Sequence, residues 1–325
     1  MDLSTKYLGL SLNNPIVVAS SGLTKTVDQI KKCEQAGAGA VVMKSVFEEQ
    51  IREADSGISD STAIHPEALD YIRAELDMQY GTREYLETIK QAKKAVSIPI
   101  IASINCHSSK WWITYAKQVE VSGADALELN IYVLPFDSEV SGSKLENSYL
   151  EILQKVKDEI NIPVALKLSP YFTSFGNFTE KLAKQGADGL VLFNRFINPE
   201  IDTKKIATST KASFDDPVGF YNSLRWVALL SGKLKLDLAA SGNIRTAEDV
   251  IKQLLAGASA IQIASVIYKN GFWKIEEMLN DLKAWMKEKN FNSVADFQGK
   301  LSQQNNPQEK MYVRAQYIKT FAGVE

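Results

Sequence analysis

One short phrase recurs four times along this chain: Gly-Ala, any residue, a small residue and then an aliphatic one. Each copy follows a stretch with helical periodicity and opens a run of apolar residues. The copies begin at Gly37, Gly123, Gly186 and Gly257. Glycine adopts the left-handed conformation that ends a helix, and small residues let the chain turn tightly into a buried strand. Repeated helix-to-strand turns of this kind predict βα units around a parallel sheet.

Eight runs rich in Val, Ile, Leu and Ala predict strands that are buried on both faces. They span Ile16–Ser20, Ala40–Ser45, Ile98–Ile104, Ala126–Ile131, Val164–Leu168, Gly189–Phe193, Leu234–Ala240 and Ala260–Ala264. Amphipathic helical stretches lie between or after them, at Glu84–Ala95, Lys110–Val121, Tyr149–Ile160, Ala247–Leu255 and Phe272–Lys289. This alternation predicts an α/β fold, a closed (β/α)8 TIM barrel. An open doubly wound sheet is the alternative, because strand number does not show closure.

Size and composition fit one large domain. The chain has 325 residues, of which 45% are hydrophobic and 23% are charged, as is usual for soluble globular proteins. We expect a single barrel domain over residues 1–325, with a helical extension at its C-terminal end from about residue 290.

Several classes of function are disfavoured. No apolar run approaches the ~18 residues of a membrane span, and the first residues lack a signal-peptide core. The net charge of −2 gives no reason to expect nucleic acid or an acidic membrane surface as a partner. Two cysteines, Cys33 and Cys106, do not form a disulfide framework and predict a cytoplasmic protein. Two histidines and no metal-ligand spacing argue against a metal site.

Long polar segments follow three of the predicted strands. They span Phe47–Gly81, Pro135–Ser143 and Ile197–Asp216. Loops of this length in a compact domain are usually functional or disordered, and barrel enzymes keep their active sites at the C-terminal ends of the strands. We therefore expect the active site at that end, covered by these loops.

Polar and small residues stand where the aliphatic runs end, and we take them as the candidate site. They are Ala19, Ser20, Lys44, Ser45, Asn105, Asn130, Lys167, Asn194, Ser241, Gly242, Asn243, Ala264 and Ser265. A single polar residue at a strand exit is usually an ordinary surface residue. Two lysines and three asparagines together favour a planar polar ligand with many donors and acceptors.

The turns after the last two strands indicate a phosphate site. Barrels often bind phosphate there through backbone N–H groups. Strand seven ends in Ser241-Gly242-Asn243, strand eight ends in Ala264-Ser265, and Thr246 begins a helix. The simpler alternative is that Gly242 only makes a tight βα turn.

An ordered set of motifs resembles the FMN-dependent dihydroorotate dehydrogenases, most closely the class 1 enzymes. The motifs are Asn14-Pro15-Ile16, Met43-Lys44-Ser45, Glu128-Leu129-Asn130, Leu166-Lys167-Leu168-Ser169-Pro170, Ser241-Gly242-Asn243-Ile244 and Ser293–Lys300. The resemblance implies a (β/α)8 barrel with FMN at the C-terminal ends of the strands and its phosphate at strands seven and eight. It also implies a homodimer and hydride transfer to flavin N5.

The resemblance assigns roles by position. Ala19 and Ser20 pack against the flavin, and Lys44 and Ser45 contact its isoalloxazine edge. Lys167 lies by the N1/O2 region, where positive charge stabilises the reduced anion. The phosphate corner is formed by Ser241, Gly242, Asn243, Ala264 and Ser265. Asn130 and Asn194 contact both flavin and substrate, and Lys44 also lies near the substrate. The catalytic candidates are Lys44, Asn130 and Lys167. Asn105 is added on geometric grounds, because it follows the third strand.

The chain departs from the family in its substrate half. Val133 stands where class 1 enzymes have the cysteine that removes the substrate C5 proton. Ser61–Glu67 replaces the segment that grips orotate, and Phe214–Pro217 stands near a missing Gly-Gly pair. We assign no catalytic base. The residues nearby that carry a titratable or hydroxyl group are His65, Cys106, His107, Tyr132, Ser141 and Ser143.

Three functions therefore stay open. The first is a flavin oxidoreductase acting on a small pyrimidine-like substrate. The second is a flavin-free barrel lyase or aldolase that uses Lys44 or Lys167 as a Schiff-base amine. The third is an FMN electron carrier that works with a separate iron–sulfur partner, because the chain has no cysteine-rich motif of its own.

Overall fold

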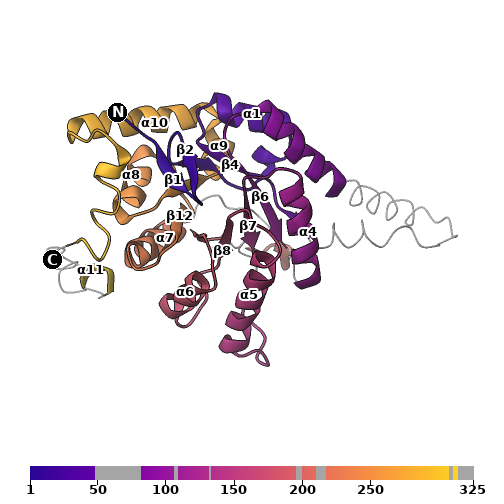
Figure 1. Cartoon of the computed structure of the whole chain (residues 1–325). Helices are drawn as coiled ribbons and strands as arrows, with labels where there is room; N and C mark the ends of the chain where they lie inside the picture. The colour runs from indigo at the N-terminus through magenta and orange to yellow at the C-terminus, as the bar shows by residue number, and fades with distance from the viewer. Residues whose placement is uncertain are drawn as a thin grey trace.

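Eight parallel strands form a closed barrel with helices around it (Figure 1). The computed structural model describes residues 1–47, 82–105, 109–131, 133–194, 200–209, 217–306 and 310–313. The strands are β3 (Ile16–Val18), β4 (Ala40–Val42), β6 (Ile100–Asn105), β7 (Ala126–Asn130), β8 (Val164–Leu168), β9 (Gly189–Leu192), β12 (Asp237–Ser241) and β13 (Ala260–Ile263). Pairing of β3 with β13 and of β4 with β6 completes the ring. The predicted TIM barrel is confirmed, and the ring excludes the open sheet.

The helices cover the outside of this ring. They are α1 (Val27–Gln35), a helix over 82–95, α4 (Ser109–Val121), α5 (Gly142–Lys157), α6 (Phe175–Lys184), α7 (Pro217–Leu230), α8 (Ala247–Ala256), α9 (Ser265–Asn270) and α10 (Trp273–Glu288). The glycine that opens each repeated phrase has a positive φ. Gly257, for example, has φ 114° and donates its N–H to Gln253 and Leu254 at the end of α8. The repeated phrase is thus the turn from helix to strand that the sequence predicted.

An N-terminal hairpin closes one end of the barrel, and the sequence did not predict it. It consists of β1 (Thr5–Tyr7) and β2 (Leu10–Leu12). Tyr7 and Leu8 pack among small and aliphatic residues that start the barrel strands, including Ala126, Ala165 and Ala260. The N–H of Leu8 donates to Asp237, the first residue of β12, at 2.7 Å. The hairpin therefore fills the N-terminal end of the barrel, and the C-terminal end is the one left for a site.

The three long polar segments that follow predicted strands are described by the structure to different extents. Most of the first, 48–81, lies outside the described residues. The segment after β9 contains a short antiparallel hairpin of β10 (Glu200–Asp202) and β11 (Ala207–Ser209). The segment after β7 is a loop, but α5 begins at Gly142, earlier than the predicted Tyr149. A further two-residue strand, β5 (Val46–Phe47), extends the pairing of β6.

The C-terminal segment packs back on the barrel helices. Its helical elements within the described residues are short: η2 (Val294–Asp296) and α11 (Lys310–Val313). Backbone N–H groups of Gly299 and Leu301 donate to Leu254 and Leu255 of α8. Across the described ranges, no helix has the length and apolar character needed to span a bilayer.

Candidate active site

The predicted site residues all lie at the C-terminal ends of the barrel strands or in the turns that follow. Each of the eight strands contributes at least one of them. Strand side chains alternate between the barrel interior and its outer face, so residues two apart share a face. Ala126 and Ala165 lie in the interior cluster at the closed end. The same alternation brings Asn130 and Lys167 into the interior at the open end.

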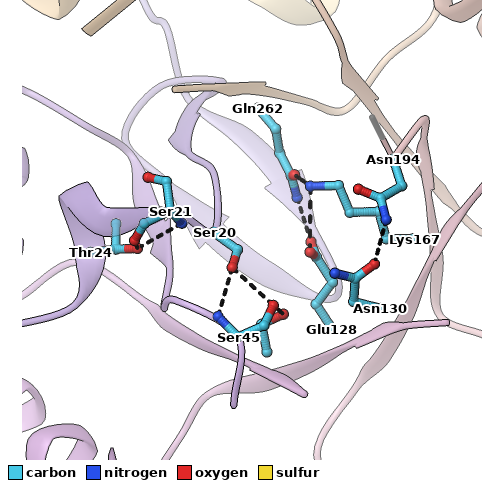
Figure 2. Close-up of polar contacts among 10 residues, drawn as sticks. Ser20, Ser21, Thr24, Ser45, Glu128, Asn130, Lys167, Asn194 and Gln262 are labelled. Carbon is cyan, nitrogen blue, oxygen red and sulfur yellow. Dashed lines mark hydrogen bonds and ion pairs between the residues drawn. The ribbon is translucent and has the colours of Figure 1, made fainter. Parts of the chain in front are cut away.

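The central feature of the site is a buried lysine held by two polar side chains (Figure 2). Nζ of Lys167 donates to Oε1 of Gln262 at 2.9 Å and lies 3.6 Å from Oε1 of Glu128. Nε2 of Gln262 donates to Oε2 of Glu128 at 2.6 Å. The three residues come from β8, β13 and β7 and are 6%, 2% and 1% exposed. A buried ammonium is stable only with such partners.

Two amides flank Lys167 on its neighbouring strands. Nδ2 of Asn194, which follows β9, donates to Oδ1 of Asn130, the last residue of β7, at 2.8 Å. Asn130 is the register partner of Lys167. Figure 2 shows both amides beside the lysine. Ammonium and amide groups together can recognise the carbonyl oxygens and N–H groups of a planar ring.

Serine hydroxyls line the opposite side of the site. The Oγ atoms of Ser20 and Ser45 form a hydrogen bond of 3.0 Å. The Oγ atom of Ser45 forms a second one, of 2.8 Å, with the Oγ atom of Ser103 on β6. The N–H of Ser45 also donates to Oγ of Ser20 at 2.8 Å. Behind them, Tyr85 accepts from the N–H of Ser103 at 2.8 Å. Burial raises the pKa of Tyr85, so its phenol stays protonated and donates to the Ser103 carbonyl.

Lys44 and Asn105, two other polar residues predicted for the site, are not part of this hydrogen-bond network. Lys44 is exposed, and its Nζ lies 5.7 Å from the ring centroid of Phe47. Asn105 is buried at the end of β6 and pairs in register with Phe47. Both stand at strand ends as predicted, but the partners of Lys167 are Gln262 and Glu128.

The predicted phosphate corner has a backbone conformation that suits close approach. Gly242 and Asn243 both have positive φ, 112° and 52°, in the turn after β12. Ala264 is the residue before α9, and no side chain caps that helix. The predicted cap of α8 is confirmed, because Thr246 Oγ1 accepts from the N–H of Asp249. The chain after β3 also packs closely on α9: a Cβ at Gly22 would lie 2.6 Å from the hydroxyl of Tyr268.

The structure supplies no base at the position of the family cysteine. Val133 is partly buried against the core. It lines a cavity of about 510 Å³ together with Leu134, Phe136, Tyr171 and Phe172. Ser141 caps α5 by accepting from the N–H of Lys144, and Ser141 and Ser143 are both exposed. His65, Cys106, His107 and Tyr132, together with Ser61–Glu67 and the Phe214–Asp216 stretch, lie outside the described residues.

Sequence reasoning missed Glu128, Gln262 and Ser103. A signal for the first two was present, because each is a single polar residue inside an otherwise apolar strand: Ala-Leu-Glu-Leu-Asn and Ala-Ile-Gln-Ile. Their contact with Lys167 reaches across the barrel interior, from β13 on one side to β7 and β8 on the other. Only the closed ring with its register brings them together.

Comparison with known proteins agrees with this geometry. A family model described as dihydroorotate dehydrogenase matches residues 2–286. A relative from Pyrococcus abyssi is 30% identical over 305 residues, 91% of this chain and 98% of the relative. Relatives from Pyrococcus furiosus and Thermoplasma acidophilum are 28% and 27% identical, and each match covers 92% of this chain and 98% of the relative.

All three relatives are named dihydroorotate dehydrogenase B (NAD(+)), catalytic subunit. The family model extends from the first strand of the N-terminal hairpin into α10, so that it includes every strand of the barrel. The resemblance read from the motifs is thereby confirmed. The chain belongs to the dihydroorotate dehydrogenase family.

Proposed function

We propose that this protein is an FMN-dependent oxidoreductase acting on a CH–CH bond of a dihydropyrimidine-like ring. The observation that carries the proposal is the buried Lys167 at the open end of the barrel, with the amides of Asn130 and Asn194 beside it. Membership of the dihydroorotate dehydrogenase family gives the reaction class. When bound, FMN would supply the hydride acceptor for such a reaction, and the residues of the site would bind and orient the ring against it.

The donor set fits a flavin. Lys167 would supply positive charge to the N1/O2 edge of a bound flavin, which is where a reduced flavin carries its negative charge. Ser20 and Ser45 lie on the opposite side of the site, and Ala19 precedes them at the end of β3. The turn at Gly242 and Asn243 and the uncapped start of α9 at Ala264 and Ser265 would hold the phosphate through backbone N–H groups.

The flavin-free aldolase is not favoured. A Schiff-base amine must lose its proton and attack a carbonyl, and burial among apolar groups usually assists that loss. Lys167 instead lies in an ion pair with Glu128 and in a hydrogen bond to Gln262. Lys44 is exposed and lies against Phe47. Neither lysine has the isolated apolar setting that such chemistry needs.

A second polypeptide that passes electrons to or from FMN is part of the proposal. The relatives are named as catalytic subunits, which favours a catalytic rather than a carrier role for this chain. No group of three or more His, Cys, Asp or Glu side chains within the described part of the chain is placed to hold a metal. An iron–sulfur centre would therefore be sought on the partner. A homodimer and a cytoplasmic location stay predictions.

The substrate is proposed to be a dihydropyrimidine other than dihydroorotate. Val133 cannot accept the proton that the family cysteine removes, and the cavity beside it is lined largely by apolar side chains. The test is anaerobic bleaching of the flavin absorbance by a series of dihydropyrimidines with and without a 6-carboxylate. Bleaching by an uncarboxylated member supports the proposal, and failure of the whole series to reduce a flavin that dithionite reduces contradicts it.

A further inference from the structure

The side chain of Gln262 lies between a buried ammonium and a buried carboxylate. Its Oε1 accepts from Nζ of Lys167 at 2.9 Å, and its Nε2 donates to Oε2 of Glu128 at 2.6 Å. These two bonds fix which end of the amide faces which charge, because an ammonium only donates and a carboxylate only accepts. Figure 2 shows the three side chains meeting at this point.

Lys167 and Glu128 do not form a direct hydrogen bond. Their closest atoms are 3.6 Å apart, whereas charge-assisted N–H···O bonds are about 2.7–2.9 Å. Oε1 of Glu128 accepts no hydrogen bond from any described residue. Two opposite charges in so dry a place attract strongly. Gln262 therefore acts as a spacer that holds the ammonium away from the carboxylate.

The same geometry leaves donors for a ligand. The ammonium of Lys167 has three N–H groups, and one of them donates to Gln262. Glu128 is two residues before Asn130 on β7, nearer the closed end, while Asn130 is the register partner of Lys167. The Glu128 carboxylate thus lies between Lys167 and the closed end of the barrel, and the opposite side of Lys167 faces the open end.

We infer that Glu128 and Gln262 are positioning residues that set the place and the net charge of Lys167 at the flavin. The inference rests on the proposed function. Glu128 offsets part of the positive charge that Lys167 presents, and Gln262 keeps the ammonium far enough from Glu128 to reach the flavin. The two residues therefore act in opposite directions on the stability of the reduced flavin.

Two near-isosteric substitutions test this inference. Glu128→Gln keeps an acceptor for Gln262 and removes the negative charge. Gln262→Met removes the spacer and lets Lys167 close on Glu128. The readout is the equilibrium constant for reduction of the bound FMN, measured against a reference dye. We expect it to rise about tenfold in Glu128→Gln and to fall about tenfold in Gln262→Met, or roughly 30 mV in opposite directions for a two-electron couple.

Asp237→Asn is the matched control. It makes the same change of charge in the same barrel, but Asp237 starts β12 and holds the N-terminal hairpin. Four residues of strand, about 13 Å, separate it from Ser241 at the open end. Its reduction constant should stay within about twofold of the wild type. Thermal melts of all variants without FMN record any loss of packing separately.

Each outcome decides a different point. Shifts of opposite sign with an unmoved control support the inference. Equal or same-sign shifts overturn it and leave a purely structural role for the two residues. If only one of the two variants folds, the sign of its shift decides. If the wild type takes up no FMN, the proposed function fails and this inference fails with it, whereas FMN uptake with unmoved constants overturns the inference alone.

Discussion

Asn194 donates to Asn130 at 2.8 Å across the strand that carries Lys167. The two amides come from β7 and from the turn after β9, so the pair bridges both neighbours of β8. An amide that is held by another amide keeps a fixed orientation. This relationship makes the pair one unit of the site rather than two separate contacts.

The first prediction is that the two amides are coupled in FMN binding. Asn130→Ala and Asn194→Ala should each weaken binding, and the double variant should lose less than the sum, with a coupling energy of roughly 0.5–3 kcal/mol. Fluorescence titration of the apoprotein with FMN gives the dissociation constants. Asn147→Ala, on the exposed face of α5, is the control. Additive losses would show that the pair does not act as a unit.

The second prediction concerns the charge of Lys167. Lys167→Ala should lower the reduction potential of the bound flavin and slow its reduction, because the positive charge that stabilises the reduced anion is removed. The expected loss is on the order of 2–4 kcal/mol, as for other preorganised donors. Lys157→Ala removes a lysine that pairs with Asp188 outside the site and should leave the potential unchanged. An unchanged potential in Lys167→Ala with FMN bound would contradict the assigned role.

The third prediction concerns dihydroorotate. Because position 133 is a valine and cannot act as a general base, the oxidation of dihydroorotate should be slower by a factor of ~10²–10⁴ than in an efficient flavoenzyme. Val133→Cys should restore measurable turnover only if the ring still docks against Asn130 and Asn194. Stopped-flow bleaching of the flavin under anaerobic conditions measures both proteins. Rapid bleaching of the wild type would show that another residue supplies the base.

The fourth prediction concerns Cys33. It is fully buried on α1, and burial raises the pKa of its thiol from 9.0 to about 12. The thiolate is the reactive form, so iodoacetamide at pH 8 should leave Cys33 unmodified in the folded protein and label it after unfolding. Peptide mass spectrometry separates it from Cys106. Fast labelling of folded protein at Cys33 would contradict the burial.

The same thiol gives the sign of a pH effect. Between pH 9.0 and about 12 the unfolded chain releases this proton and the folded chain keeps it. The contribution of Cys33 to stability is therefore present below pH 9.0 and falls as the pH rises through this window. Cys33→Ala should flatten that part of the pH dependence, as measured by urea unfolding between pH 8 and pH 10.5.

The barrel was predictable from the sequence because its signals are local. Strands buried on both faces are continuous apolar runs, and a glycine with positive φ marks the turn from helix to strand in the four repeated phrases. Each of the eight predicted runs overlaps a barrel strand. The N-terminal hairpin escaped prediction because β1 and β2 have three residues each, too few to show a period. Leu8 has a left-handed conformation in the turn of this hairpin, with φ 55°, and leucine is not a residue type that predicts such a turn.

The site was predictable as a set of strand ends but not as a set of contacts. Strand order and the rule for barrel enzymes place Lys167, Asn130 and Asn194 at one end of the fold. The partners of Lys167 depend on the register of three strands and on closure of the ring, and neither can be predicted from a single sequence. Glu128 and Gln262 were therefore absent from the predicted site residues, although the first makes an ion pair and the second a hydrogen bond with the lysine.

The most direct test of the proposed flavin site is the amount of FMN bound per chain. Purified protein, incubated with FMN and freed of excess, is denatured by heat, and the supernatant is measured by absorbance and chromatography. We expect one non-covalent FMN per chain, and a Gly242→Val variant, strained at φ 112° in the turn after β12, should retain much less. A colourless protein that takes up no FMN would contradict this expectation.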